Sequence, residues 1–311
     1  MSGANATHNF YAMLDAAMAR AGETIAFEEE NGAATSYAAL RDDVARMAGA
    51  LTDLGVTVGD RVTAQVEKSR TNVLLYLATL QIGAVYNPLN TAYTPAELDY
   101  FIGDAKPALL TVDPASRDAL APIATGHGVT AIETLDATGT GSLADRASTA
   151  EPNADIAACG ADDLACLLYT SGTTGRSKGA MITHGNLSSN AEALHSHWRF
   201  APGDVVLHAL PIYHVHGLFV CLHTALLNGS MMLWLPRFDL DAVIERLPRA
   251  TVMMGVPTFY TRLLSDSRFD RELVAGMRLF VAGSAPLLAE THTEFEARTG
   301  HRILERYGMT E

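Results

Sequence analysis

The sequence lacks the features that mark several broad classes of protein. It has only three cysteines, Cys159, Cys166 and Cys221, without regular spacing, which predicts ordinary thiols and neither a disulfide framework nor a zinc site. Lys and Arg number 22 against 35 Asp and Glu, so the net charge is −13. A general nucleic-acid-binding protein needs a basic surface to displace counterions, and this balance argues against that role. Any recognition of phosphate must therefore be local.

Long apolar segments are also missing. No apolar run reaches the roughly 20 residues that cross a bilayer as a helix. Residues 1–5 show no basic region followed by an apolar core, which is what a secretory signal requires. We therefore expect a cytoplasmic location and no membrane partner, and we have no expectation for the oligomeric state.

What the sequence does have is enough apolar residues, 48% of the total, to bury large cores. Segments with strand-like and helix-like periodicity alternate along most of the chain, which predicts an α/β fold with mainly parallel sheets flanked by helices. The expected strands are 25–27, 61–66, 85–87, 108–112, 164–168, 205–210, 231–235, 251–255 and 279–282. The expected helices are 9–20, 37–54, 72–82, 95–104, 217–227, 239–247, 257–264 and 286–299, with a further helix-like segment beginning near Thr183.

Residues 136–163 show little periodicity and are predicted to be a connector. We therefore expect two units, 1–160 and 161–311. The connector contains Gly139-Thr140-Gly141-Ser142-Leu143-Ala144, which nearly matches the dinucleotide-binding fingerprint. Because no convincing strand precedes it, we interpret it as a turn.

A glycine- and hydroxyl-rich segment, residues 169–179, follows the apolar strand 164–168. Its glycines allow the backbone to approach a ligand closely, and its hydroxyls with Arg176 and Lys178 suit a polyphosphate. A flexible Gly/Ser linker is the alternative, but linkers rarely follow a buried strand directly. The P-loop pattern fits poorly, because Lys178 is followed by glycine and not by Ser or Thr.

This segment resembles the phosphate loop of the adenylate-forming enzymes, the superfamily of acyl-CoA synthetases, luciferases and peptide-synthetase adenylation domains. Further segments resemble other motifs of that family and occur in the same order. They are Pro211-Ile212-Tyr213-His214, Gly255-Val256-Pro257-Thr258, Gly283-Ser284-Ala285-Pro286 and Tyr307-Gly308-Met309-Thr310-Glu311.

The resemblance implies the N-terminal α/β part of an ATP-dependent, AMP-forming acid:CoA ligase, with ATP, Mg²⁺ and coenzyme A as cofactor or co-substrates. Such enzymes form an acyl-adenylate and pyrophosphate and then transfer the acyl group to the coenzyme A thiol. Family members continue into a barrel and a lysine-bearing C-terminal domain. We therefore expect this chain to end before those parts and to adenylate poorly by itself.

The resemblance also implies roles for individual residues. Thr170, Lys178 and His214 would act in catalysis, with His214 as a wall or gate between the acyl pocket and the phosphates. Glu311 would coordinate Mg²⁺ with help from Thr170. ATP would be bound by Thr170, Ser171, Gly172, Thr173, Thr174, Gly175, Lys178, Gly283, Ser284, Ala285, Pro286, Tyr307, Gly308, Met309 and Thr310, with the Tyr307 ring stacked on adenine.

The histidines near residue 214 could suggest a metal site when taken alone. His214 and His216 form a His-x-His pair, and His208 and His223 are close in sequence. No carboxylates accompany them at suitable spacing, so we do not favour a metal centre.

The nature of the acid is suggested by two arginines. Arg306 precedes Tyr307, where family members that act on fatty or aromatic acids commonly have a small or neutral residue, and Arg262 follows the acyl-pocket segment. Two guanidinium groups suit a second carboxylate on the substrate, because each can bind it through two hydrogen bonds. The acid-binding residues would be Arg262, Arg306, His214, Val256, Thr258 and Ser284.

These segments look most like those of malonyl-CoA synthetases, so we expect malonate or methylmalonate as the acid. Three alternatives remain open. The chain could belong to a fatty-acyl or aryl-CoA ligase, or it could be a nucleotide-binding module without turnover. Arg306 could also form only a surface ion pair with Glu305 or Glu311.

Overall fold

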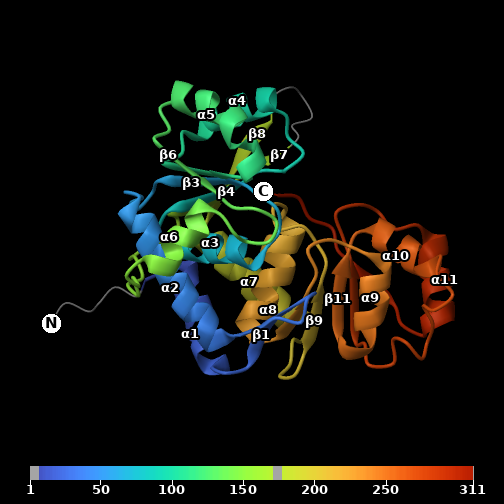
Figure 1. The fold of residues 1–311 in the computed structure, drawn as a ribbon. Helices are drawn as coiled ribbons and strands as arrows, with labels where there is room; N and C mark the ends of the chain where they lie inside the picture. Colours follow the sequence, from blue (N-terminus) through green and yellow to red (C-terminus); the bar gives the residue numbers. More distant parts are fainter. Residues whose placement is uncertain (1–6, 171–176, 311) are drawn as a thin grey trace. The chain divides into compact units, whose positions relative to one another are not determined.

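The computed structural model describes residues 7–170 and 177–310, and the chain forms two compact units (Figure 1). Of the described residues, 7–16 and 39–189 belong to unit 1, and 17–38 and 190–310 belong to unit 2. Each unit is built on one mainly parallel sheet, as the sequence predicts. The predicted boundary near residue 160 lies within unit 1.

Unit 1 contains a six-stranded sheet in the order β6-β5-β3-β4-β7-β8. All neighbouring strands are parallel except β7 and β8. Helices α4 and α5 cover one face, and α3 and α6 lie on the other (Figure 1). The strands are β3 (Arg61–Gln65), β4 (Val85–Pro88), β5 (Leu109–Val112), β6 (Ala131–Thr134), β7 (Leu164–Thr170) and β8 (Lys178–Thr183), and the helices are α3 (Arg70–Gln81), α4 (Pro95–Ala105), the short η1 (Pro114–Ser116), α5 (Arg117–Gly126) and α6 (Ser142–Thr149).

Local sequence signals explain why these helices begin where they do. The Ser69 side chain accepts a hydrogen bond from Asn72 N and caps α3, while Thr94 and Glu97 form a capping box at α4 with Pro95 in its first turn. Every residue of α3 from Asn72 to Gln81 is buried. A helix that is apolar on all sides belongs in the interior, and α3 lies there.

The predicted connector was wrong, because residues 136–163 contain α6, and β6 precedes it. Gly139 to Gly141 therefore lie in the turn between β6 and α6, and Ser142 to Ala144 are the first residues of α6. The signal was weak because β6 is only four residues long and α6 buries only Leu143 and Ala147. A Cβ at Gly141 (φ +140°) would overlap the Thr134 carbonyl, so this glycine serves a tight turn of the chain itself.

Unit 2 contains a seven-stranded sheet in the order β13-β12-β11-β9-β10-β1-β2, parallel except for β1 and β2. Apolar side chains between the sheet and helices α9, α10 and α11 form its large core, which includes Tyr260, Phe280 and Phe295. The strands are β1 (Ile25–Glu29), β2 (Ala34–Ser36), β9 (Val205–His208), β10 (Met231–Trp234), β11 (Val252–Gly255), β12 (Leu279–Ala282) and β13 (Ile303–Glu305), and the helices are η2 (His216–Leu222), α8 (His223–Asn228), α9 (Leu240–Arg246), the short η3 (Leu247–Arg249), α10 (Pro257–Leu264) and α11 (Ala289–Thr299).

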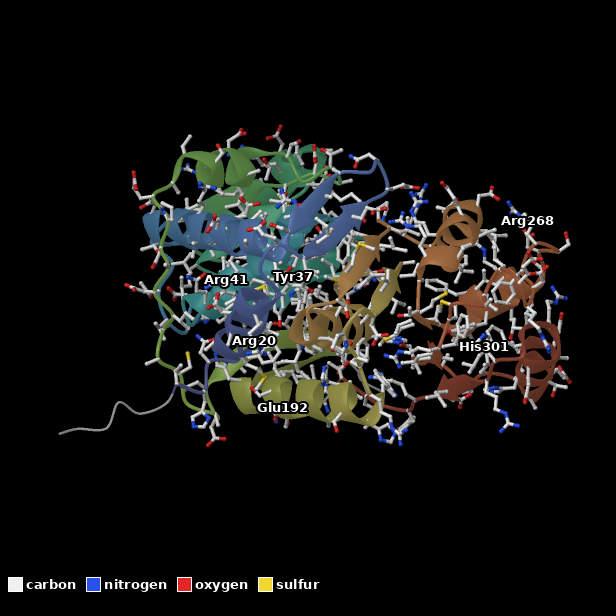
Figure 2. The ribbon with its side chains drawn as sticks, turned by 90° about the horizontal axis from the view of Figure 1, so that it is seen from below. Arg20, Tyr37, Arg41, Glu192, Arg268 and His301 are labelled. Atoms are coloured by element: carbon white, nitrogen blue, oxygen red, sulfur yellow. The ribbon has the colours of Figure 1, made fainter. Side chains whose placement is uncertain are left out.

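The chain passes between the two units within α1 (Phe10–Ala21), α2 (Tyr37–Asp53) and α7 (His184–His197). Tyr37, labelled in Figure 2, is completely buried, and its hydroxyl donates to the Ser230 carbonyl at 2.7 Å. No helix in the described part of the chain is long and apolar enough to span a membrane.

Two predicted helices of unit 2 differ from the structure. The expected helix 217–227 is divided into η2, which is a π-helix, and α8. The expected helix 286–299 begins only at Ala289, because Leu288 has an extended backbone (φ −69°, ψ 143°). Both departures occur beside the motifs, and π-helical segments are frequent at functional sites.

Candidate active site

Four motif segments meet at one edge of the unit 2 sheet. Strands β11, β12 and β13 run parallel with Gly255, Ala282 and Glu305 in register, and β9 ends in the same direction. The segments beginning at Pro211, Val256, Gly283 and Arg306 therefore leave the carboxyl ends of neighbouring strands. In open α/β sheets this edge is where ligands bind.

His216 is held at this edge by the start of the π-helix. Gly217 packs against the Pro211 carbonyl so closely that a Cβ would overlap the oxygen, and His208 Nε2 lies 3.0 Å from the Gly217 carbonyl oxygen. The His216 side chain is only 4% exposed. Its Nδ1 lies 3.2 Å from Ser284 Oγ, whereas its Nε2 is buried without a hydrogen-bond partner among the described residues.

The loop after β12 carries the Ser284 side chain and lies beside the side chains of His216 and Arg306. The Gly283 amide donates to the Gly255 carbonyl at 3.1 Å. A Cβ on Gly283 would lie 3.1 Å from Arg306 Cγ and 3.2 Å from His216 Cε1, so the absence of a side chain allows both neighbours to approach. Ser284 has φ +71°, a left-handed conformation that is strained for a residue other than glycine.

Arg306 follows β13 and is half-buried, with its amide donating to the Ala282 carbonyl at 2.8 Å. Its guanidinium group makes no hydrogen bond or ion pair with any described residue. Glu305 does not pair with it, because that carboxylate accepts from Leu287 N at 3.1 Å and lies 3.4 Å from His292 Nε2. Glu311, the other suggested partner, is outside the described residues.

The electrostatics of this cluster favour an anionic ligand. Burial lowers the pKa of Arg306 because the charged guanidinium is partly removed from water. Burial, followed by repulsion from Arg306, lowers the pKa of His216 to about 4, so the imidazole is neutral at pH 7. The edge thus combines a cation that has no partner among the described residues with a neutral imidazole, and a carboxylate could pair with both.

Arg262, the second predicted acid-binding arginine, lies elsewhere on unit 2. Its side chain is exposed, and its guanidinium carbon lies 4.7 Å from the centre of the Phe238 ring. Phe238 in turn stacks on Phe259 at 4.1 Å between ring centres. No contact joins Arg262 to Arg306 within the described ranges, so a paired guanidinium site stays a prediction.

The remaining predicted residues of unit 2 lie around the same edge. His214 is exposed beside Tyr213, with 4.5 Å between ring centres, and desolvation lowers its pKa. Val256 precedes the first turn of α10, and Thr258 is exposed within that turn. The Tyr307 side chain is 90% exposed, so its ring is available for stacking. Ala285, Pro286, Gly308 and Met309 are exposed, and Thr310 is partly buried.

In unit 1 the predicted phosphate-binding segment joins β7 to β8. The helix that we expected near Thr183 is α7, which begins at His184, but the sequence did not predict β8: β7 and β8 form an antiparallel hairpin whose last pair is Thr170 and Lys178. The Thr170 hydroxyl donates to the Lys178 carbonyl at 3.4 Å. The predicted residues Ser171, Gly172, Thr173, Thr174 and Gly175, together with Glu311, lie outside the described residues.

The end of this hairpin next to the predicted phosphate loop is tied to α4. The Tyr169 hydroxyl donates to the Asp104 carboxylate at 2.7 Å, and the Tyr100 hydroxyl donates to the Ser177 carbonyl at 2.8 Å. The Tyr169 ring also packs on Phe101 with 4.4 Å between centres. These contacts hold both ends of the predicted phosphate loop in place.

The other histidines near residue 214 contact protein groups. His208 packs on Trp234 with 4.6 Å between ring centres, and His223 stacks on Phe219 at 5.3 Å. Within residues 7–170 and 177–310, no three His, Cys, Asp or Glu side chains are grouped as metal ligands.

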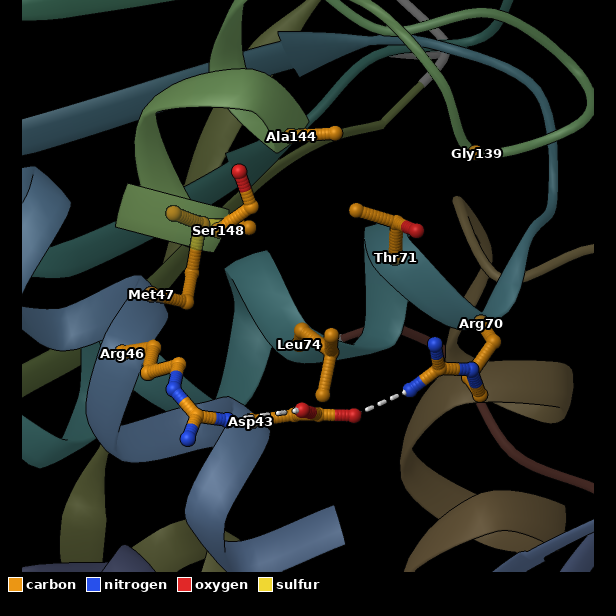
Figure 3. Close-up of a pocket in the computed structure, with 10 residues that line it drawn as sticks. Asp43, Arg46, Met47, Arg70, Thr71, Leu74, Gly139, Ala144 and Ser148 are labelled. Carbon is orange, nitrogen blue, oxygen red and sulfur yellow. Dashed lines mark hydrogen bonds and ion pairs between the residues drawn. The ribbon is translucent and has the colours of Figure 1, made fainter. Parts of the chain in front are cut away.

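Unit 1 also has a cavity of about 420 Å³ between α2, α3 and α6 (Figure 3). Two arginines face it, but both share the Asp43 carboxylate: Arg70 Nη1 lies 2.7 Å and Arg46 Nη1 3.7 Å from its oxygens. The three side chains connect α2 with α3. Unlike Arg306, these arginines already have an anionic partner.

Sequence reasoning missed His216 and chose His214 of the same motif. The available signal was the position of His216 immediately before Gly217 in an apolar segment, which is typical of a buried side chain. What the pattern could not reveal was the contact with Ser284, which is 68 residues away.

Comparison with known proteins gives consistent results. The sequence profile of the family "AMP-binding enzyme" matches residues 14–311. A mitochondrial malonate–CoA ligase of Mus musculus is 35% identical over 277 residues, which are 83% of this chain and 47% of that protein. A feruloyl-CoA synthase of an Amycolatopsis species is 34% identical over 283 residues, 90% of this chain and 55% of that protein.

Among solved structures, ATP-bound MatB from Rhodopseudomonas palustris has a TM-score of 0.95 and 52% identity, covering 98% of this chain and 60% of that one. The chain spans about half the length of the curated relatives that it matches.

Proposed function

Since the chain belongs to the AMP-binding enzyme family, we propose that it forms part of an ATP-dependent acid:CoA ligase, and that the acid substrate is a small dicarboxylate, malonate or methylmalonate. The malonate–CoA ligase of mouse supports the choice of acid. The feruloyl-CoA synthase shows that relatives of similar identity act on a different acid, so the choice must come from the site.

One observation carries the proposal: Arg306 is half-buried at the carboxyl edge of the unit 2 sheet without an anionic partner among the described residues. A buried charge is costly when it has no counter-charge, and a dicarboxylate supplies one. One carboxylate would react while the other binds Arg306. A monocarboxylic acid would leave the guanidinium without a partner, and about 3 kcal/mol of binding free energy would be lost, which is roughly 100-fold in affinity.

The reaction would have two steps. An oxygen of the acid attacks the α-phosphorus of ATP, the bond to the bridging oxygen breaks, and pyrophosphate leaves. The coenzyme A sulfur then attacks the acyl carbon of the adenylate, its proton is lost, and AMP leaves. Both steps move negative charge, so they require groups that shield it and hold the reactants in line.

For ATP, the described residues suit parts of the nucleotide. Tyr307 offers an exposed ring on which adenine can stack, beside the segment from Gly283 to Pro286. The hairpin anchored by Tyr100 and Tyr169 would carry the phosphate loop with Lys178 at its base. The bound acid would lie beside His214, Val256 and Thr258.

For Mg²⁺, Thr170 has a suitable hydroxyl oxygen, and Glu311 would add a carboxylate. The metal would neutralise charge on the phosphates.

The cytoplasmic location stays a prediction, since the mouse relative is described as mitochondrial.

The test is calorimetric titration of the chain with ATP·Mg²⁺, followed by malonate, methylmalonate, butyrate and ferulate. We expect the dicarboxylates to bind, and butyrate and ferulate to bind at least 10-fold more weakly. Arg306→Met should weaken malonate binding about 100-fold and leave butyrate binding unchanged, because only the second carboxylate loses its partner.

Arg302→Met is the matched control. Arg302 is exposed four residues earlier and pairs with Glu296, so its loss should leave malonate affinity within 2-fold. Arg262→Met tests whether the second guanidinium takes part. Equal affinity of the unmodified chain for malonate and butyrate would refute the dicarboxylate proposal and favour a fatty-acyl ligase, while preferred binding of ferulate would favour an aryl ligase.

A further inference from the structure

We propose that Ser284 is a positioning residue for the acid: its hydroxyl donates to His216 Nδ1, so that His216 presents Nε2–H as a donor to the substrate carboxylate beside Arg306. This inference rests on the proposed function and deepens it. The resemblance places Ser284 among both the nucleotide-binding and the acid-binding residues, and the inference states how it would act on the acid, namely through His216.

The first support is the unsatisfied nitrogen. His216 is only 4% exposed, and Nδ1 has Ser284 Oγ at 3.2 Å, but Nε2 has no partner among the described residues. Buried polar atoms in proteins are nearly always hydrogen-bonded, so such an atom at a ligand-binding edge indicates that a ligand completes it. The same edge carries Arg306, whose guanidinium group also has no described partner.

The second support is the backbone of Ser284. At φ +71° a side chain crowds the backbone, and glycine would adopt this conformation without strain. Strained residues persist where the surrounding structure holds them, and they gather at functional sites. Here the strained residue is also the one whose hydroxyl meets His216.

The third support is the chemistry of a neutral imidazole. One ring nitrogen then carries the proton and the other is an acceptor. The nearby positive charge of Arg306 and the burial of the ring both oppose the doubly protonated form. If Nδ1 carried the proton, the Nε2 lone pair would face the lone pairs of the carboxylate. A hydroxyl can donate to Nδ1, and this allows Nε2–H to point at the acid.

Ser284→Gly separates this role from a structural one. The substitution removes the hydroxyl and relieves the strained conformation, so the midpoint of thermal unfolding should stay the same or rise. Malonate affinity, measured by calorimetry with ATP·Mg²⁺ present, should nevertheless fall about 10-fold, since one hydrogen bond to a charged group is weakened. Ser267→Gly, at an exposed serine of unit 2 without a positive φ, controls for the added backbone freedom: it should lower the unfolding midpoint slightly and leave malonate affinity unchanged.

The tautomer can be observed directly. Long-range ¹H–¹⁵N correlation spectra of the malonate complex, with His216 assigned through His216→Gln, should show Nε2 protonated and Nδ1 as an acceptor. In Ser284→Gly the two forms should become mixed. A merely structural role of Ser284 would leave the tautomer unchanged.

The outcomes distinguish the inference from the function on which it rests. If the unmodified chain does not bind malonate, the proposed function is wrong. If it binds malonate and Ser284→Gly binds it equally well, only the inference is wrong. A proton on Nδ1 in the complex, or a loss of ATP affinity in place of malonate affinity in Ser284→Gly, would also overturn the inference.

Discussion

The two edges of the unit 2 sheet differ in how their charged side chains are paired. At the amino edge, Asp204 precedes β9 and Arg278 precedes β12. The Asp204 side chain is 4% exposed and accepts two hydrogen bonds from Arg278, one of them from Nε at 2.6 Å. It also accepts from Ala201 N at 2.8 Å and from the Thr251 hydroxyl at 3.0 Å. Each buried charge at this edge has its partner within the protein.

At the carboxyl edge of the same sheet, polar side-chain groups lack a hydrogen-bond or ion-pair partner among the described residues. Within the described residues, Arg306 has no anionic partner and His216 Nε2 has no hydrogen-bond partner, and Ser284 is strained. The strands are common to both edges, so the fold does not require this difference. The paired charges of the amino edge stabilise the fold, whereas in the proposed function the groups of the carboxyl edge bind the ligand.

The largest expected effect comes from removing the ion pair at the amino edge. Arg278→Ala leaves the Asp204 carboxylate buried without its cation, and we expect the free energy of unfolding to fall by about 3 kcal/mol. Urea unfolding followed by circular dichroism measures this change. Asp204→Asn combined with Arg278→Ala should recover part of the loss, because no uncompensated charge remains. A loss below about 0.5 kcal/mol for Arg278→Ala would mean that the pair is only a surface ion pair.

The sequence predicted the carboxyl edge far better than the amino edge. Each motif there is a short run of glycine, hydroxyl and aromatic residues directly after an apolar strand, so both the strand end and the ligand chemistry can be inferred locally. Asp204 and Arg278 are 74 residues apart, and nothing in either segment identifies the other as a partner. Their pairing depends on the strand order β12-β11-β9, which local periodicity does not contain.

The missed elements have a similar explanation. Strand β8 begins Lys178-Gly179-Ala180, with little of the branched or aromatic character that marks a strand, and it exists because it pairs with β7. His216 and His214 share one motif, and the pattern could not show that His216 contacts Ser284. Burial separates them: His216 is enclosed beside Ser284, and His214 is exposed.

A second and smaller effect should appear with pH at the carboxyl edge. The pKa of His216 is lowered from 6.5 to about 4 in the folded chain, by burial and then by Arg306. Between these pH values the unfolded chain binds a proton that the folded chain does not. The stability from this group is therefore present above pH 6.5 and is lost as pH falls toward 4.

The matched variant for this effect is His216→Gln, which cannot take up that proton. The free energy of unfolding of the unmodified chain should fall between pH 7 and pH 4.5 by on the order of 2 kcal/mol more than that of His216→Gln. Urea unfolding at a series of pH values measures the difference. Parallel pH profiles would show that His216 is protonated as readily in the folded chain as in the unfolded one.

The smallest effect is the most direct test of the contrast between the two arginines. Arg306→Met replaces a half-buried charge that has no described partner with an apolar side chain of similar length, so the ligand-free chain should be unchanged in stability or gain up to about 1 kcal/mol. Urea unfolding without ligand measures this, with Arg278→Met as the matched variant at the other edge. If the free energy of unfolding fell by about 3 kcal/mol in both variants, Arg306 would also have an anionic partner within the protein. The contrast between the edges would then disappear. A loss in Arg278→Met alone, together with weaker malonate binding in Arg306→Met, would assign stability to one edge and ligand binding to the other.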